Sequence, residues 1–403
     1  MTNQVSRSRA ARAAWILAVA VLLPAARLDA QDTRAETIAA RQAEKAAALA
    51  PYQPKAFERI LARLEANLAS PPNGFYPEIG RIRQGGGFSL GVGYRRFFAR
   101  NALWAVRTRY SVKNYKQVEV GTRTPWDGGG RLTLEAKAGW LDAPQVAYYG
   151  VGMPPESART SFDLNQTYAA ATAEFRPNSW TRLDGEVGFD DYSTEPGHGS
   201  HPSIETRHNP GDTPALFSDV SFIRVQARAA IDSRTSAGYS RNGGLYGLTL
   251  ASFADRGHPY GFQQLDAEAI QHLPIVRDNW VFSVRGRVQT ILGEDDAVPF
   301  FLLPQLGGGR TLRGYDTGRF RDRHSILTSA EFRWVPSRLA LDMALFYDAG
   351  KVTARRGDLD FDGLKSDWGI GVRFHAPGTT VLRIEAARGT DGWRLVMSRS
   401  AAW

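Results

Sequence analysis

The most specific segment of this sequence is the glycine-rich stretch 306–315, which reads Leu-Gly-Gly-Gly-Arg-Thr-Leu-Arg-Gly-Tyr. A glycine run can present backbone amides to a phosphate group, as nucleotide-binding loops do. Those loops continue with Lys and Ser or Thr and lie between a strand and a helix, and neither feature occurs here. We therefore interpret the glycines as residues that let a long loop fold back tightly.

A group of histidines forms a second candidate site. His198, His201 and His208 lie in one Gly- and Pro-rich stretch near Asp191 and Glu195, and such side chains can bind a metal ion. The sequence around them offers no partner that would orient the imidazole rings. We expect a solvated loop here, with no metal and no cofactor.

The same stretch contains the pair His198 and Ser200, which has the His-x-Ser spacing of outer-membrane phospholipases. In those enzymes the pair lies on a barrel strand, whereas here it lies between Pro196 and Pro202. The chain also has no Gly-x-Ser-x-Gly motif. We expect no enzymatic activity.

The elements that position these loops are predicted strands with alternating polarity. Trp104, Val106 and Tyr110 share one face of a strand, while Arg107 and Arg109 share the other. In a transmembrane barrel the apolar face contacts lipid and the charged face lines the lumen. The lumen-facing arginines of this and other strands are Arg107, Arg109, Arg285, Arg287, Arg373 and Arg383.

The pattern predicts sixteen strands in an antiparallel transmembrane β-barrel over residues 75–403. Many are about ten residues long, as a tilted membrane strand requires. Long connections are expected to alternate with short ones around Pro177, Pro274, Pro336 and Pro377. The predicted spans are 76–85, 87–98, 102–113, 115–124, 129–142, 161–176, 180–193, 217–233, 243–257, 260–273, 279–293, 321–335, 338–349, 366–376, 379–388 and 393–403.

The two ends of the chain support a location in the outer membrane. Basic residues precede the apolar run 14–23, which indicates a signal peptide over residues 1–30. Trp403 is the last residue, and a terminal aromatic at the membrane interface suits the last strand of a barrel and its assembly signal. The chain has no cysteine, so neither disulfides nor thiolate metal sites contribute.

Residues 31–74 contain the only convincing helical pattern, a short segment broken at Pro51 and Pro54. Its second part places Phe57, Ile60 and Leu64 on one face. We expect this segment to rest on the periplasmic rim of the barrel. The alternative, that it enters the lumen as a plug, stays open.

Several motifs resemble the bacterial surface antigen superfamily, which includes barrel-assembly and two-partner-secretion transporters. The segment 312–315 resembles the Val-Arg-Gly-Phe/Tyr motif of this superfamily, and 346–350 matches its Phe-x-Asp-x-Gly motif. Segments 329–333 and 148–152 resemble two further motifs in the expected order. The resemblance covers roughly residues 75–403.

The resemblance implies that the long loop folds into the lumen and that Arg313 pairs with Asp348. Strand parity agrees, because Asp348 lies opposite the face carrying Met343 and Leu345. The alternative is an ordinary lumen ion pair that only holds the loop. The residues assigned to this loop anchor are Arg313, Gly314, Tyr315, Asp348, Glu331, Arg333, Phe346 and Gly350.

By this resemblance the chain is a member without POTRA domains, because residues 31–74 are too few to hold one. We expect a gated conduit that assists protein or lipid insertion or passage, opening at a seam where Pro77 and Gly80 weaken the first strand. Its expected partners are outer-membrane lipids, the barrel-assembly machinery and a separate periplasmic protein, and not nucleic acid. The alternative is a passive channel for small anions, suggested by the lumen arginines.

Overall fold

The computed structural model describes residue 40 and residues 73–99, 102–125, 130–257, 260–276, 279–293, 297–336, 340–376 and 378–403. The predicted signal peptide (1–30) and nearly all of the predicted helical segment (31–74) lie outside these residues, so both remain predictions. Within the described ranges, no helix has the length and apolar content needed to cross a membrane.

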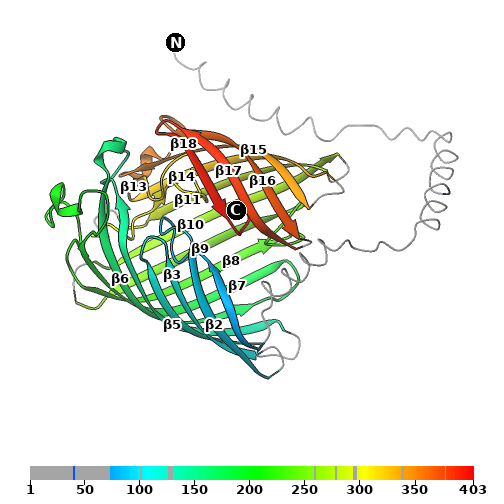
Figure 1. Ribbon diagram of the computed structural model, residues 1–403, viewed down its shortest axis with the longest axis horizontal. Helices are drawn as coiled ribbons and strands as arrows, with labels where there is room; N and C mark the ends of the chain where they lie inside the picture. The colour runs from blue at the N-terminus through cyan, green and yellow to red at the C-terminus, as the bar shows by residue number, and fades with distance from the viewer. Residues whose placement is uncertain are drawn as a thin grey trace, which may run out of the picture. The chain divides into compact units, whose positions relative to one another are not determined.

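The described chain forms one sixteen-stranded antiparallel sheet that curls into a nearly closed barrel (Figure 1). This confirms the predicted fold class. The short strands β12 (Gln305–Leu306) and β13 (Phe320–Arg321) pair with each other inside one loop. The barrel strands are β1 (Gly74–Gly80), β2 (Ser89–Ala99), β3 (Ala102–Ser111), β4 (Lys116–Pro125), β5 (Leu132–Tyr148), β6 (Thr160–Phe175), β7 (Thr181–Pro196), β8 (Val220–Asp232), β9 (Gly243–Asp255), β10 (Phe262–Val276), β11 (Trp280–Ile291), β14 (His324–Trp334), β15 (Leu341–Thr353), β16 (Lys365–Ala376), β17 (Thr379–Gly389) and β18 (Gly392–Ser398).

The strands bury one face and expose the other, as their alternating sequence predicts. On β9, Leu248 and Leu250 are exposed, while Leu245 on the opposite parity is buried. On β15, Met343 and Leu345 point outward, whereas Asp342, Ala344 and Phe346 are buried inside the barrel. The outer surface is therefore apolar and suited to lipid.

Connection lengths differ between the two ends of the barrel. The loop end carries the four longest connections, at 149–159, 197–219, 292–323 and 354–364. The opposite turn end, predicted to face the periplasm, has shorter ones apart from 233–242. The turn predicted around Pro274 is misplaced, because β10 continues to Val276 and accommodates the proline where the register shifts.

The first and last strands meet at an unpaired seam. β1 and β18 have seven residues each, and in the described part of the chain no ladder of backbone hydrogen bonds joins them. Nη1 of Arg399, just beyond β18, donates across the seam to the carbonyl oxygen of Ile79 at 2.5 Å. Among the described strands, the seam is the one break in the circuit of backbone ladders.

The C-terminal residues 399–403 correct the sequence prediction. The last strand was expected to reach Trp403 with this side chain at the membrane interface, but β18 ends at Ser398. Trp403 instead packs against the buried, lumen-facing Leu245 and Ile270 and stacks on His272 with ring centroids 5.7 Å apart. This apolar patch inside the barrel offers the indole a packed site.

An apolar core fills the loop end of the barrel. It combines side chains from the ends of β5, β6, β7, β8, β10 and β11 with Phe300, Phe301 and Leu303 of the loop 292–323. The rings of Phe162 and Phe300 are 4.7 Å apart, and both side chains are fully buried. Residues 298–303 of the loop 292–323 are therefore an integral part of the barrel interior.

Candidate functional site: the lumen loop and its ion-pair network

The loop 292–323, which we call the lumen loop, reverses direction inside the barrel through β12 and β13. Gly307 and Gly308 at the reversal have φ angles of 109° and 96°, a region that side chains disfavour. A Cβ on Gly307 would lie 2.1 Å from the carbonyl oxygen of Asp316. The glycine run therefore makes the tight return that the sequence suggested.

Arg313 on this loop reaches Asp348 on β15. Its Nε donates to Oδ2 at 2.7 Å and its Nη2 donates to Oδ1 at 2.9 Å, a two-bond pairing of guanidinium and carboxylate. The guanidinium carbon also lies 3.4 Å from the ring centroid of Phe346. Arg313 is only 1% exposed and Asp348 is fully buried.

The pair belongs to a larger network of buried charges. Nη1 of Arg313 also donates to Glu331 at 3.1 Å and to Glu385 at 3.2 Å. Arg373 bonds the same two carboxylates, including Oε1 of Glu331 at 2.6 Å. Glu385 belongs to this network but was not predicted from the sequence. Its position on β17, two residues from Arg383 and on the same face, was the available signal.

Two more arginines complete the network. Nη1 of Arg383 lies 3.3 Å from Glu385, and its Nη2 donates to the carbonyl of Gly309 at 2.7 Å. Nε of Arg333 lies 3.6 Å from Glu331. Four guanidinium groups thus share three carboxylates.

Small residues let the loop approach the barrel wall closely. A Cβ on Gly314 of the loop would lie 2.5 Å from Cβ of Asp367 on β16, and one on Gly350 of β15 would lie 3.0 Å from Cδ1 of Leu306 on the loop. Tyr315 packs in a buried apolar cluster, and its hydroxyl donates to the carbonyl of Ser366 at 3.0 Å. The contacts of segment 312–315 are therefore with β14, β15, β16 and β17, on the C-terminal side of the seam.

The charge state of Arg313 follows from these contacts. Burial alone lowers the pKa of a guanidinium, but the charges of Asp348 and Glu385 outweigh it and hold the pKa of Arg313 above its ordinary value. Arg313 stays protonated, so its attraction to the network does not change across the physiological pH range.

Most of the arginines predicted to line the lumen are paired, and Arg285 and Arg287 line a cavity inside the barrel. Arg107 lies 3.2 Å from Glu119, Arg285 lies 2.6 Å from Glu268, and Arg287 bonds Asp266. Arg109 donates to the carbonyl of Arg81. These pairs compensate the positive charge on which the anion-channel alternative was based.

The turn 233–242, which we call the floor strap, was not foreseen. It leaves β8 and reaches across to β15, β16 and β17, where Thr380 donates to the carbonyl of Gly238 at 3.0 Å. Tyr239 donates to Asp342 at 2.7 Å and stacks on His375 with centroids 4.1 Å apart. A single tyrosine among Ser, Gly and Arg was the only sequence signal for this contact.

The three histidines do not come together. Among the described residues, no three His, Asp or Glu side chains are close enough to hold a metal ion. His208 packs its ring against Tyr148 at a centroid distance of 4.9 Å. His198 and Ser200 lie exposed in the loop 197–219.

Known proteins resemble this chain in fold. BamA from Haemophilus ducreyi lacking POTRA domains 1–3 superposes with a TM-score of 0.62 at 13% identity, covering 81% of this chain and 70% of that one. CdiB from Escherichia coli gives a TM-score of 0.52 at 12% identity, and CdiB from Acinetobacter baumannii gives 0.49 at 12%. The matches cover 80% of this chain and 61% and 58% of those proteins, respectively.

No curated protein matches the chain by sequence. A family model does, and its match extends over residues 97–391, from β2 to the connection before β18. That range contains the lumen loop, all four arginines of the network and the three carboxylates that they share. The barrel, the inward loop and this match agree, and the chain belongs to the Omp85 superfamily.

Proposed function

We propose that this protein is a gated outer-membrane barrel that assists a protein or lipid to insert into, or cross, the outer membrane. The observation that carries the proposal is the seam between β1 and β18, two short strands without a backbone ladder between them in the described chain. Separating strands costs little where few hydrogen bonds must be broken. Membership of the Omp85 superfamily supports this assignment.

The attachment of the lumen loop supports opening at the seam rather than through the lumen. Segment 312–315 is held on the C-terminal side of the seam through Arg313, and Arg383 of the same side holds Gly309. The loop can therefore stay in place while β1 moves away from β18. The apolar core at the loop end keeps the lumen filled meanwhile.

The passive anion channel is the weaker candidate. Most of the arginines that suggested it are compensated by nearby carboxylates, and packed side chains occupy the loop end. We expect no catalysis from this barrel. The partners that we propose are outer-membrane lipids, the barrel-assembly machinery and a periplasmic protein on a separate chain that delivers the substrate.

A cross-link across the seam tests the proposal. Because the chain has no native cysteine, Ile79→Cys combined with Arg399→Cys can be joined by a short bismaleimide. The matched control joins Val120→Cys to Ala138→Cys, which are register partners on β4 and β5. The readouts are insertion of an unfolded reporter barrel into vesicles that contain the protein, and movement of a fluorescent lipid between leaflets.

We expect the seam cross-link to stop at least one of these activities and the control cross-link to leave both unchanged. Releasing the seam with a cleavable linker should restore the rate. Full activity with a quantitatively cross-linked seam would contradict lateral opening.

A further inference from the structure

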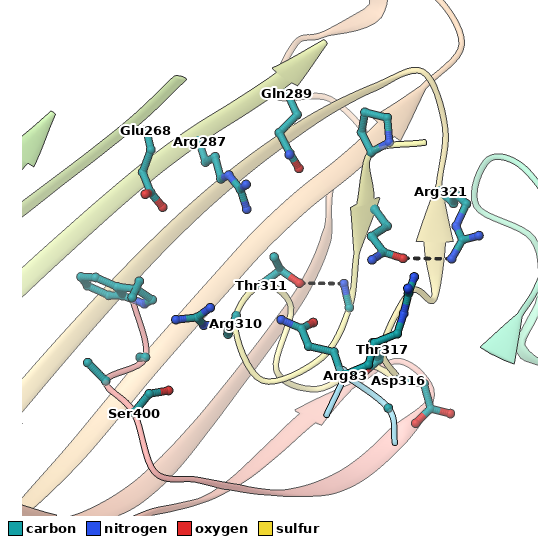
Figure 2. A pocket seen from close by; sticks show the side chains of 18 of the residues that line it. Arg83, Glu268, Arg287, Gln289, Arg310, Thr311, Asp316, Thr317, Arg321 and Ser400 are labelled. Carbon is teal, nitrogen blue, oxygen red and sulfur yellow. Dashed lines mark hydrogen bonds between the residues drawn. The ribbon is translucent and has the colours of Figure 1, made fainter. Parts of the chain in front are cut away.

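A cavity of about 900 Å³ lies inside the barrel between the lumen loop, the floor strap and the C-terminal residues 399–403. We call it the central chamber. Figure 2 shows Arg83, Arg287, Arg310 and Arg321 around it, together with Ser400 of the C-terminal segment. Its volume falls in the range of pockets that hold a small molecule.

The chamber is strongly cationic. Ten arginine and lysine side chains line it, against the carboxylates of Glu268 and Asp316. Four of the ten have a carboxylate partner: Arg159 with Asp316, Arg285 with Glu268, Arg287 with Asp266, and Arg234 with Asp232. In the described part of the chain, the other six have none within 4 Å: Arg83, Lys113, Arg228, Arg310, Arg321 and Arg399.

Arg321 is the least exposed of these six cations, and its charge has no carboxylate nearby among the described residues. Its side chain is 1% exposed and donates only to neutral oxygens, the carbonyl of Phe300 at 3.0 Å and Oε1 of Gln305 at 2.9 Å. Burial lowers the pKa of Arg321 to about 10, so it is still charged at neutral pH. A buried charge without an opposite charge is destabilising, and a bound anion would compensate it.

The lumen loop contributes side chains to the chamber rather than a backbone cradle. The amide of Gly307 donates to Oγ1 of Thr311 at 2.9 Å, and that of Gly308 donates to the carbonyls of Leu312 and Tyr315. These amides are therefore engaged within the loop. Arg310, which follows them, is exposed and has no carboxylate partner among the described residues.

We propose that the central chamber binds a compact anion carrying several phosphate charges. Guanidinium groups match phosphate oxygens in geometry, and the six uncompensated cations suit a ligand with a high charge in a small volume. Either a soluble polyphosphate or the phosphorylated headgroup of a lipid has this chemistry. The site does not depend on the proposed conduit function, because it requires only the closed chamber.

Calorimetric titration of sodium tripolyphosphate into the purified protein in detergent tests the site. We expect one site per barrel, with affinity that falls as salt is added. Arg228→Gln combined with Arg310→Gln should weaken binding about tenfold or more, because hydrogen bonds to charged groups are lost. The matched control is Arg355→Gln, which removes an exposed arginine from the connection 354–364 outside the chamber.

A second measurement does not depend on the double variant folding. Arg310→Cys gives a unique thiol in the chamber, and tripolyphosphate should slow its reaction with an anionic thiol reagent. Nanodiscs with lipid A distinguish the two sources of phosphate. If lipid A protects the thiol of Arg310→Cys, the ligand is a lipid headgroup. If only tripolyphosphate protects this thiol, the ligand is a soluble phosphate.

Three results would overturn the proposal. One is no heat of binding and no protection by tripolyphosphate at low salt. Another is equal weakening by Arg355→Gln, which would place binding elsewhere. The third is oligoglutamate that binds as tightly as tripolyphosphate, which would indicate an acidic peptide segment as the ligand.

Discussion

Arg313 holds the lumen loop through hydrogen bonds and ion pairs of ordinary geometry. Losing one of them is costly because the charged groups are buried. Its guanidinium contacts carboxylates on three different strands, β14, β15 and β17, and lies over the ring of Phe346. No single neighbouring side chain can replace Arg313, because each of the three carboxylates would lose a hydrogen-bond donor. The residue therefore couples the position of the loop to the register of the C-terminal strands.

Arg313→Ala should destabilise the barrel by about 3–5 kcal/mol, because it leaves buried carboxylates uncompensated. Urea unfolding in detergent measures this change. Arg310 lies three residues earlier, and its side chain is exposed. Arg310→Ala should therefore change the free energy of unfolding little. If Asp348→Asn added to Arg313→Ala restores no stability, the pair is not the source of the loss.

His208 gives the loop 197–219 a dependence on pH. Burial and the nearby Arg207 lower the pKa of His208, and its Nε2 is buried without a hydrogen-bond partner in the described structure. The unfolded chain therefore takes up a proton more readily, and stability falls as pH drops below about 6.5, the ordinary histidine value.

Thermal unfolding between pH 8 and pH 5 checks this expectation. His208→Gln should lose part of the pH dependence, while His198→Gln in the same loop should retain it. A constant difference between wild type and His208→Gln at every pH would show that the ring contributes only through packing.

At the level of elements, the alternating polarity of the sequence predicts the barrel strands but not the floor strap. Alternating polarity predicted the strands because each of them has one face in lipid and one in the lumen. The strap has no such period, and its contacts with β15, β16 and β17 depend on barrel closure. Trp403 was misplaced for the same reason, since only the closed barrel creates its site beside His272.

Tyr239→Phe should loosen the floor strap, because it removes the hydrogen bond to Asp342 and leaves that buried carboxylate with one donor fewer. The expected cost is about 1–3 kcal/mol. Hydrogen exchange of residues 233–242 measures the local effect. Tyr347→Phe, which removes the hydroxyl of an exposed tyrosine on β15, is the control; equal exchange in both variants would contradict a role for the strap contact.

At the scale of the whole molecule, the arrangement predicts how the barrel conducts ions. Wild type should give small, flickering currents in planar bilayers, because the lumen loop and the apolar core fill the interior. Arg313→Ala should enlarge them by releasing the loop. Large, steady, anion-selective currents in wild type would instead favour the passive channel.

Deletion of residues 32–69 completes this measurement. A helical segment resting on the rim predicts unchanged currents, and a lumen plug predicts larger ones.

The barrel was accessible from the sequence because strand parity encodes it locally. The contact between Arg313 and Asp348 was accessible only because the motifs that contain these residues resemble those of a known superfamily. The central chamber was not, since its lining comes from segments as far apart as Arg83 and Arg399.

The inward course of residues 399–403 has a practical consequence for anyone producing this protein. A purification tag or fluorescent fusion attached after Trp403 would begin inside the lumen, against His272 and Leu245. Such an extension would have to displace the tryptophan or thread out past the floor strap. Insertion into the exposed connection 354–364 avoids the interior altogether.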